Sequence, residues 1–238
     1  MRSLLALLCL AAALPLRAEP LTVYYIEKPP YYHTEKGQPT GFLLERTRAI
    51  FSQAAIAVHF EARPAKRILL ELEQGQAAAC STGWFKTPQR EAFARFSRAI
   101  YRDEPMTILT RATLQQQLSS YSSLADLLAS PLRLGVVDGF SYGELDALLA
   151  RGNPSRVTAP PSQNVRMLAA ERIDYTLVDE RELPYILAEA DLNNARLSSL
   201  KMPDIPPGQR RYLMCSKAVG DEVMKALDRS IQRLGLEP

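Results

Sequence analysis

Segments typical of strands and of helices alternate along nearly the whole chain, and this alternation constrains the fold more than any other feature. Leu21 to Tyr25 is a strand-like run, and the stretch from Gly41 to Phe51 places apolar residues at helical spacing. Val58 to Ala62 is a second strand-like run, Pro64 can open a second helix, and Ala77 to Cys80 is a third strand-like run. Such an order is typical of α/β proteins, so we expect helices that flank mainly parallel sheets.

Two extended segments divide this alternation into two lobes. Residues from Phe96 to Arg111 have an extended pattern, and residues from Pro203 to Gly208 form the segment richest in proline. The same strand and helix signals repeat between them. We predict a discontinuous first lobe over residues 19–104 and 203–238, and an inserted second lobe over residues 105–202, joined by two crossover connections. Ligands of open α/β sheets lie beyond the carboxyl ends of strands, so we expect an interlobe cleft that closes around a ligand.

The N-terminus has the pattern of a signal peptide over residues 1–18. Arg2 supplies a positive charge, and Leu4 to Leu16 is an apolar run too short to span a bilayer. No later stretch of the sequence has the length and apolar character of a membrane span, so we expect an exported protein of the periplasm. Without Arg2 and Arg17 the chain keeps 27 basic residues against 26 acidic ones, a balance that favours neither nucleic acid nor an acidic membrane as partner.

Two cysteines remain after the expected cleavage, Cys80 and Cys215. Both lie in short apolar stretches that resemble strands, so they could be neighbours in one sheet and form a disulfide in an oxidising compartment. The alternative is a pair of buried free thiols. His33 and His59 are the only histidines and no C-x-x-C motif occurs, so the sequence predicts no metal site and no cofactor.

One expected helix start contains the first candidate binding residue, Arg90. Thr87 is suited to cap this helix and Pro88 to occupy its first position, which puts Arg90 in the first turn. A cation there faces the positive end of the helix dipole, so the position makes sense if an anion shares the site. The alternative is that Arg90 pairs with a surface acid such as Glu91. A cradle for a carboxylate or phosphate would combine Arg90, free backbone N–H groups and the hydroxyls of Ser81, Thr82 and Thr87.

The second lobe offers two further candidates. Ser141 to Glu144 matches a capping box, which predicts a helix start at the carboxyl end of a strand. Asp179 directly follows the strand-like run from Tyr175 to Val178. Both positions would face Arg90 across the cleft. Asp179 could equally serve as the N-cap of the following helix, and both roles stay open at this point.

Several of these motifs together resemble the bacterial extracellular solute-binding proteins of family 3, the periplasmic binding proteins of amino-acid-type ABC transporters. The resemblance rests on the order of motifs over nearly the whole chain after residue 18. These motifs are Pro29-Pro-Tyr31, Gly41-Phe42, Thr87-Pro-Gln-Arg90, Phe96-Ser97 and the stretch from Arg172 to Asp179. The resemblance implies the two-lobe fold of type II periplasmic binding proteins.

The resemblance also implies a role for each candidate residue. Arg90 would hold the α-carboxylate of an amino acid in a bidentate pair, and Asp179 would accept its α-ammonium group. Further groups would donate to the ligand through hydroxyls or backbone N–H groups, namely those of Thr82, Gly83, Phe85 and Ser141.

The sequence departs from the family pattern around the expected side-chain pocket. Lys28 stands where a stacking residue is common, and Arg67 brings a further positive charge near the expected rim. Lys28 and Arg67 beside Arg90 indicate an anionic or multiply carboxylated ligand, unless they are solvated surface charges. Tyr31 and Trp84 could form walls of the pocket or belong to the core.

The function that these features favour is capture of a small polar, carboxylate-bearing solute, an amino acid or a related compound, for transport or sensing. The expected partners are the small-molecule ligand and an ABC transporter permease or a membrane sensor, with the protein acting as a monomer. The alternative is a periplasmic enzyme on the same scaffold, similar to cyclohexadienyl or prephenate dehydratases, in which Glu27, Glu180 or Asp179 would serve as general acid. We assign no catalytic residue, because no nucleophile and base occur in a recognisable pattern.

Overall fold

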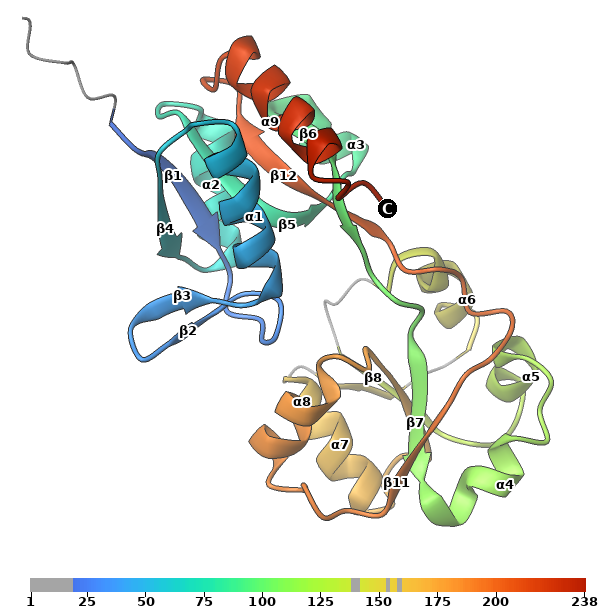
Figure 1. Ribbon diagram of the computed structural model, residues 1–238. Coiled ribbons are helices and arrows are strands. Elements are labelled where there is room, and N and C mark those ends of the chain that lie inside the picture. The colour runs from blue at the N-terminus through green and yellow to red at the C-terminus, as the bar shows by residue number, and fades with distance from the viewer. Residues whose placement is uncertain (1–18, 138–141, 153–154, 158–159) are drawn as a thin grey trace, which may run out of the picture.

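The computed structural model describes residues 19–137, 142–152, 155–157 and 160–238. Within these ranges the chain forms two lobes joined by two extended segments (Figure 1). The predicted signal peptide lies outside the described residues. Ser141, the first residue of the predicted capping box, also lies outside them.

The first lobe is built on a five-stranded sheet in the order β4-β1-β5-β12-β6. Its strands are β1 (Leu21–Tyr25), β4 (Val58–Ala62), β5 (Ala79–Phe85), β6 (Ala94–Arg102) and β12 (Arg210–Ser216). Its helices are α1 (Phe42–Gln53), α2 (Ala65–Gln74), α3 (Pro88–Phe93) and α9 (Asp221–Arg233). A small hairpin of β2 (His33–Glu35) and β3 (Gln38–Thr40) precedes α1.

The second lobe is built on a five-stranded sheet in the order β11-β7-β10-β8-β9. Its strands are β7 (Thr107–Arg111), β8 (Leu134–Val137), β9 (Ser155–Val157), β10 (Tyr175–Val178) and β11 (Leu197–Leu200). Its helices are α4 (Gln115–Leu118), α5 (Leu124–Leu128), α6 (Asp146–Leu149), α7 (Pro161–Ala169) and α8 (Leu183–Ala190), with short 3₁₀ turns η1 (Ala112–Leu114) and η2 (Gly143–Leu145).

The two-lobe α/β architecture predicted from the sequence is confirmed, but the sheets are mixed rather than mainly parallel. β1 pairs in parallel with β4 and β5, and β8 pairs in parallel with β9 and β10. β12 runs antiparallel to β5 and β6, and β7 runs antiparallel to β10 and β11. The strands next to the interlobe connections, β6, β7, β11 and β12, account for this difference. These strands lead directly into or out of the connections between the lobes. Parallel pairing requires a crossover connection, usually through a helix, and these strands lack one.

The two connections between the lobes run side by side. β6 ends at Arg102 and β7 begins at Thr107, while β11 ends at Leu200 and β12 begins at Arg210. The backbone N–H of Asp103 donates to the carbonyl of Gln209 at 3.0 Å, which ties the two segments together. Gly208 is required there, because a Cβ would come within 2.1 Å of the Asp103 carbonyl oxygen. These paired segments are the natural hinge of the molecule.

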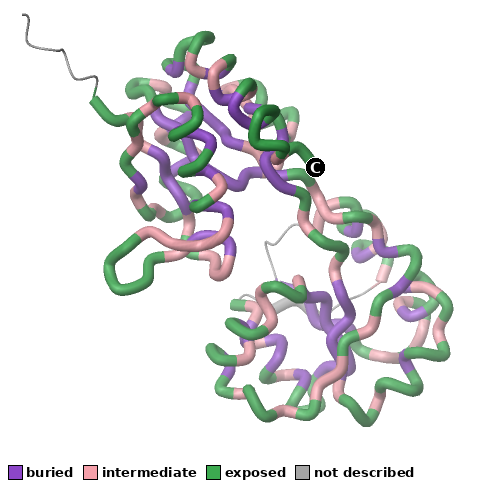
Figure 2. Tube along the Cα trace, viewed as in Figure 1, coloured by how far each residue is buried: buried purple, intermediate pink, exposed green. Residues whose placement is uncertain are grey.

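Each lobe has an apolar core on both faces of its sheet (Figure 2). In the first lobe α1 and α9 cover one face and α2 covers the other. In the second lobe α4 to α6 pack on one face, and α7 and α8 pack on the other. Two separate cores allow the lobes to move as rigid bodies. Within the described ranges, no helix combines the length and the apolar character needed to span a lipid bilayer.

Cys80 and Cys215 are joined by a disulfide in the middle of the first sheet. Cys80 in β5 lies directly opposite Cys215 in β12, and both side chains are fully buried. The bond links residues 135 positions apart, so the loop that it closes contains the whole second lobe.

Candidate functional site

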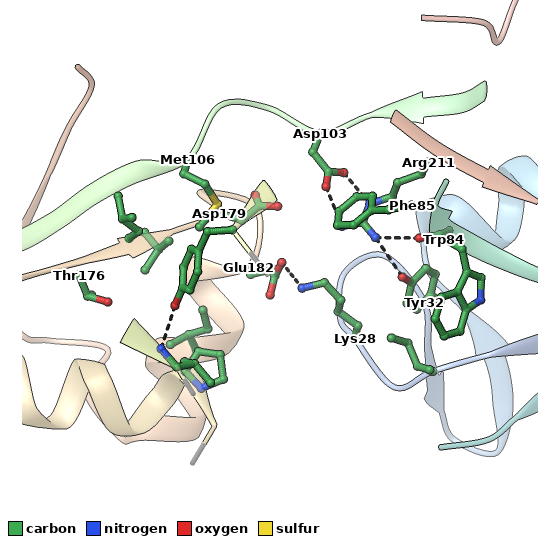
Figure 3. Close-up of a pocket in the computed structure, with 18 of the residues that line it drawn as sticks. Lys28, Tyr32, Trp84, Phe85, Asp103, Met106, Thr176, Asp179, Glu182 and Arg211 are labelled. Carbon is green, nitrogen blue, oxygen red and sulfur yellow. Dashed lines mark hydrogen bonds and ion pairs between the residues drawn. The ribbon is translucent and has the colours of Figure 1, made fainter. Parts of the chain in front are cut away.

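A cavity of about 420 Å³ lies between the two lobes, at the carboxyl ends of β5, β8 and β10 (Figure 3). The first lobe contributes Ile26, Lys28, Tyr32, Gly83, Trp84, Phe85, Arg90, Asp103 and Arg211. Met106 at the hinge and residues of the second lobe complete the lining, namely Val137, Tyr142, Pro161, Asn164, Thr176, Leu177, Val178, Asp179, Glu182 and Ile186. The charged groups come mostly from the first lobe, whereas the wall of the second lobe is largely apolar.

Arg90 is a half-buried cation without a carboxylate partner among the described residues. As the sequence predicted, Thr87 caps α3 and accepts from the Arg90 backbone N–H, and Pro88 is the first helical residue. The Arg90 guanidinium donates to the Phe85 carbonyl at 2.7 Å and lies 4.8 Å from the centre of the Trp84 ring. Burial lowers the pKa of Arg90, because no nearby charge compensates for the lost hydration. An arriving anion would supply that compensation.

The alternative partner of Arg90 is engaged elsewhere. Glu91 forms an ion pair with Lys86 at 2.8 Å, so it does not neutralise Arg90. The interpretation of Arg90 as half of a surface ion pair is therefore wrong. The helix geometry explains this result, since adjacent residues on a helix point about 100° apart and Glu91 faces solvent.

Arg211 is a second arginine of the cavity wall, and the sequence analysis missed it. Its guanidinium makes two hydrogen bonds to the Asp103 carboxylate, at 2.6 and 2.7 Å, and donates to the Gly83 carbonyl at 2.8 Å. The centres of the Tyr31 and Phe85 rings lie 4.7 and 4.6 Å from its guanidinium carbon. Only 6% of Arg211 is exposed. This satisfied charge holds the end of β5 in place rather than awaiting a ligand.

Side-chain contacts between the lobes include an ion pair and a hydrogen bond at the cavity. Lys28 forms an ion pair with Glu182, and the Tyr31 hydroxyl donates to the Asp179 carboxylate (Figure 3 shows the Lys28–Glu182 pair). Burial, with the negative charges of Asp103 and Asp179 beside it, raises the pKa of Tyr31, so the phenol remains a proton donor. Burial also raises the pKa of Glu182, although Lys28 opposes this shift.

Asp179 lines the cavity and is not the N-cap of α8. Glu182 occupies the N-cap position of this helix, which begins at Leu183. The other oxygen of Asp179 accepts from the Arg181 backbone N–H at 2.9 Å, in a tight local turn. Because both hydrogen bonds of Asp179 come from uncharged donors, its negative charge is not neutralised by a cation. Among the described residues, the cavity thus presents one cation and one carboxylate without a partner of opposite charge, on opposite lobes.

Residues 21–234 match the family model of the bacterial extracellular solute-binding proteins, family 3. The chain belongs to this family. None of the curated proteins matches it. Among solved structures, an ancestral arginine-binding protein bound to arginine is similar to this solute-binding protein, with a TM-score of 0.66 and 18% identity over 91% of this chain and 92% of that one.

Two further solved structures share the fold of this solute-binding protein. An arginine-, lysine- and histidine-binding protein from Geobacillus stearothermophilus has a TM-score of 0.64 and 16% identity, over 91% of this chain and 89% of that one. A histidine kinase sensor domain with similarity to periplasmic binding proteins has a TM-score of 0.64 and 20% identity, over 91% of this chain and 90% of that one. The family members and the first two of these structures are binding proteins.

The structure gathers most of the residues predicted for the site around one cavity. Lys28, Gly83, Trp84, Phe85, Arg90 and Asp179 all line it. Gly83 adopts a φ of 81°, and a Cβ there would lie 2.4 Å from the Tyr32 ring, so only glycine fits where β5 passes that ring.

Three other predicted residues lie away from the cavity lining. The Thr82 hydroxyl bonds to the Thr47 hydroxyl at 2.7 Å on the α1 side of the sheet. Tyr31 is fully buried beneath the cavity and reaches it only through its contact with Asp179. Arg67 lies on the outer face of α2, where 64% of its side chain is exposed and it pairs with Glu71 at 2.7 Å. Arg67 is therefore a solvated surface charge, the second of the two interpretations given above.

Proposed function

We propose that this solute-binding protein captures a small carboxylate-bearing solute, an amino acid or a close relative, in the interlobe cleft. The observation that carries the proposal is that Arg90 and Asp179 line the cavity from opposite lobes, and that neither has a partner of opposite charge among the described residues. A zwitterion complements this arrangement, since Arg90 can hold a carboxylate with two parallel hydrogen bonds and Asp179 can accept from an ammonium group.

The position of these two groups on different lobes links binding to closure. A ligand that contacts both Arg90 and Asp179 adds attractive contacts only when the lobes are close, so it shifts the population toward the closed form. The hinge at residues 103–106 and 201–209 supplies the movement. Closure would then present a surface that a membrane partner recognises, an ABC transporter permease or a sensor.

The similar structures support an amino acid as the ligand class. The ancestral protein binds arginine, and the Geobacillus protein binds arginine, lysine and histidine. The histidine kinase sensor domain of the same fold supports a sensing role as the variant of this proposal. We also propose a periplasmic location after removal of residues 1–18, and a monomer as the working unit.

Binding without catalysis is part of the proposal. Glu27 accepts from the backbone N–H and the hydroxyl of Thr34, and Glu180 lies 3.6 Å from Lys201; neither lines the cavity. Both oxygens of Asp179 act as acceptors, from the Tyr31 hydroxyl and the Arg181 backbone N–H, whereas a general acid must donate a proton. Incubation with prephenate should therefore yield no product.

A thermal-shift screen of amino acids followed by calorimetry tests the proposal. The ligand should raise Tm, and Arg90→Ala should weaken its binding by about 2 to 5 kcal/mol, because a desolvated charge pair loses one partner. Arg67→Ala is the matched control, since Arg67 is an exposed arginine outside the cavity. Unchanged affinity in Arg90→Ala would rule out the proposed clamp.

A further inference from the structure

A second cavity of about 350 Å³ adjoins the first on the hinge side of Arg90. Phe85 and Arg90 line both cavities, so the two spaces share a wall. The second cavity continues along the end of β6 and the start of β12, where Arg102 and Arg210 line it. We call this space the arginine recess, after Arg90, Arg102 and Arg210.

Like charges are held close together in the arginine recess. Arg102 and Arg210 are direct partners in the antiparallel register of β6 and β12, a placement that disfavours two cations. Arg102 donates only to the Gly208 carbonyl, at 3.2 Å, and the Arg210 side chain has no hydrogen bond or ion pair within the described part of the chain. None of the three arginines has a carboxylate partner among these residues. No ion pair within the described part of the chain therefore offsets their repulsion.

One acid faces this group of cations, and it comes from the other lobe. Glu144 in η2 lines the recess beside the hinge residue Gln209. Lys86 also lines the recess, but Glu91 already pairs with it. The charges of the lining thus leave three unpaired arginines against one carboxylate. An oxyanion with several acceptor oxygens is the chemical group that relieves such an excess.

We propose that the arginine recess binds a second anionic group of the ligand held in the cleft, so the preferred ligands are dianions such as acidic amino acids, dicarboxylates or phosphorylated amino acids. One carboxylate lies at Arg90, and the second anionic group, a carboxylate or phosphate, extends past Phe85 to Arg102 and Arg210. This inference rests on the proposed function, because it takes Arg90 as the anchor of the ligand. Arg102 and Arg210 would favour ligands with a second negative charge, and the carboxylate of Glu144 would weaken the binding of such ligands.

Trp84 provides the readout for a test. It is the only tryptophan of the chain and lies against the Arg90 guanidinium, so its fluorescence reports on ligands bound there. The probes are two pairs that differ in charge, L-glutamine with L-glutamate and L-serine with O-phospho-L-serine. In the wild-type protein the acidic member of a pair should bind about tenfold more tightly, an advantage that shrinks at high salt.

The variant Arg102→Gln/Arg210→Gln should lose this advantage and keep the affinity for the neutral member. Arg48→Gln/Arg67→Gln is the matched control, because it removes two exposed arginines from elsewhere on the same lobe and gives the same net charge. Glu144→Gln should strengthen binding of the acidic members. Because Arg102 and Arg210 are exposed and repel each other, their replacement should not lower Tm.

Three results would overturn the inference. The first is that no acidic probe binds more tightly than its neutral counterpart. The second is that the advantage persists in Arg102→Gln/Arg210→Gln. The third is simultaneous binding of inorganic phosphate and L-glutamine. It would indicate that the arginine recess binds a separate free anion, and it would contradict the proposal that one ligand occupies both cavities. Failure of the proposed function gives a different result from failure of this inference. If Arg90 does not anchor the ligand, Arg90→Ala would leave the affinities for both the neutral and the acidic member of each probe pair unchanged.

Discussion

The ion pair of Asp103 and Arg211 offers the most direct test of how the cleft is held in shape. Only 12% of the Asp103 side chain and 8% of the Arg211 side chain are exposed, and two hydrogen bonds of 2.6 and 2.7 Å join them. Asp103→Asn removes the negative charge and turns one acceptor into a donor that faces the guanidinium. Loss of one partner from a buried ion pair costs about 3 to 5 kcal/mol, because the remaining charge is buried without compensation.

We expect a loss near the lower end of that range, about 3 kcal/mol. Arg211 keeps its hydrogen bond to the Gly83 carbonyl and its contacts with the rings of Tyr31 and Phe85 after the substitution. Urea unfolding followed by Trp84 fluorescence measures the effect in the first lobe, where the only tryptophan lies. Asp221→Asn is the control, since its exposed pair with Arg95 should contribute nothing resolvable.

The double variant Asp103→Asn/Arg211→Met distinguishes two costs, that of leaving the buried guanidinium without a partner and that of losing the packing contacts of the Arg211 side chain. Methionine retains an apolar side chain next to the rings of Tyr31 and Phe85 and carries no charge, so the double variant should be more stable than Asp103→Asn alone. An unfolding free energy of Asp103→Asn within about 1 kcal/mol of wild type would refute the reasoning, because it would mean that the buried charge needs no partner.

Three further outcomes follow from contacts elsewhere in the molecule. Glu182→Gln removes the interlobe pair with Lys28, so small-angle scattering should show a larger radius of gyration; an unchanged radius would contradict this role. Hydrogen bonds from neighbouring arginines hold the pKa of Asp174 well below its usual range, so its carboxylate stabilises the fold above a pH of about 4 and this contribution declines at lower pH. Asp174→Asn should therefore have a lower unfolding free energy than wild type at pH 7, and the difference should shrink at acidic pH. A difference that does not change with pH would contradict this prediction. Reduction of Cys80–Cys215 should lower the unfolding free energy by about 2 to 5 kcal/mol in urea titrations, and equal midpoints with and without reductant would disprove it.

Local sequence patterns predicted much of the fold and one end of the site. The alternation of strand and helix signals led to the two-lobe α/β architecture, since each element carries its own periodicity. Thr87 and Pro88 fixed the start of α3, and with it the location of Arg90, because caps depend only on residues a few positions apart. The mixed direction of the strands could not be read in this way, because strand direction depends on where the chain crosses between lobes.

The contacts of the cleft wall depend on residues far apart in the sequence. Lys28 and Glu182 are separated by 154 positions, and Arg211 and Asp103 by 108, so no spacing rule relates them. Alternation in β12 did contain a signal for Arg211, which shares its inward side with Leu213 in a strand that continues to a buried cysteine. The exposed position of Arg67 was also predictable, because Glu71 stands four residues later on the same helix face.

The place of β12 in the first sheet determines the order in which the protein can be completed. β12 lies between β5 and β6, and 107 residues of chain separate the end of β6 at Arg102 from its first residue, Arg210. During synthesis or export from the N-terminus, β5 and β6 emerge before β12, the strand that lies between them. The second lobe is one continuous segment, so it can fold before β12 emerges. A protein truncated before Arg210 would retain a foldable second lobe attached to an open first sheet. The final 29 residues therefore act as the closing piece of a lobe that the chain began almost two hundred residues earlier.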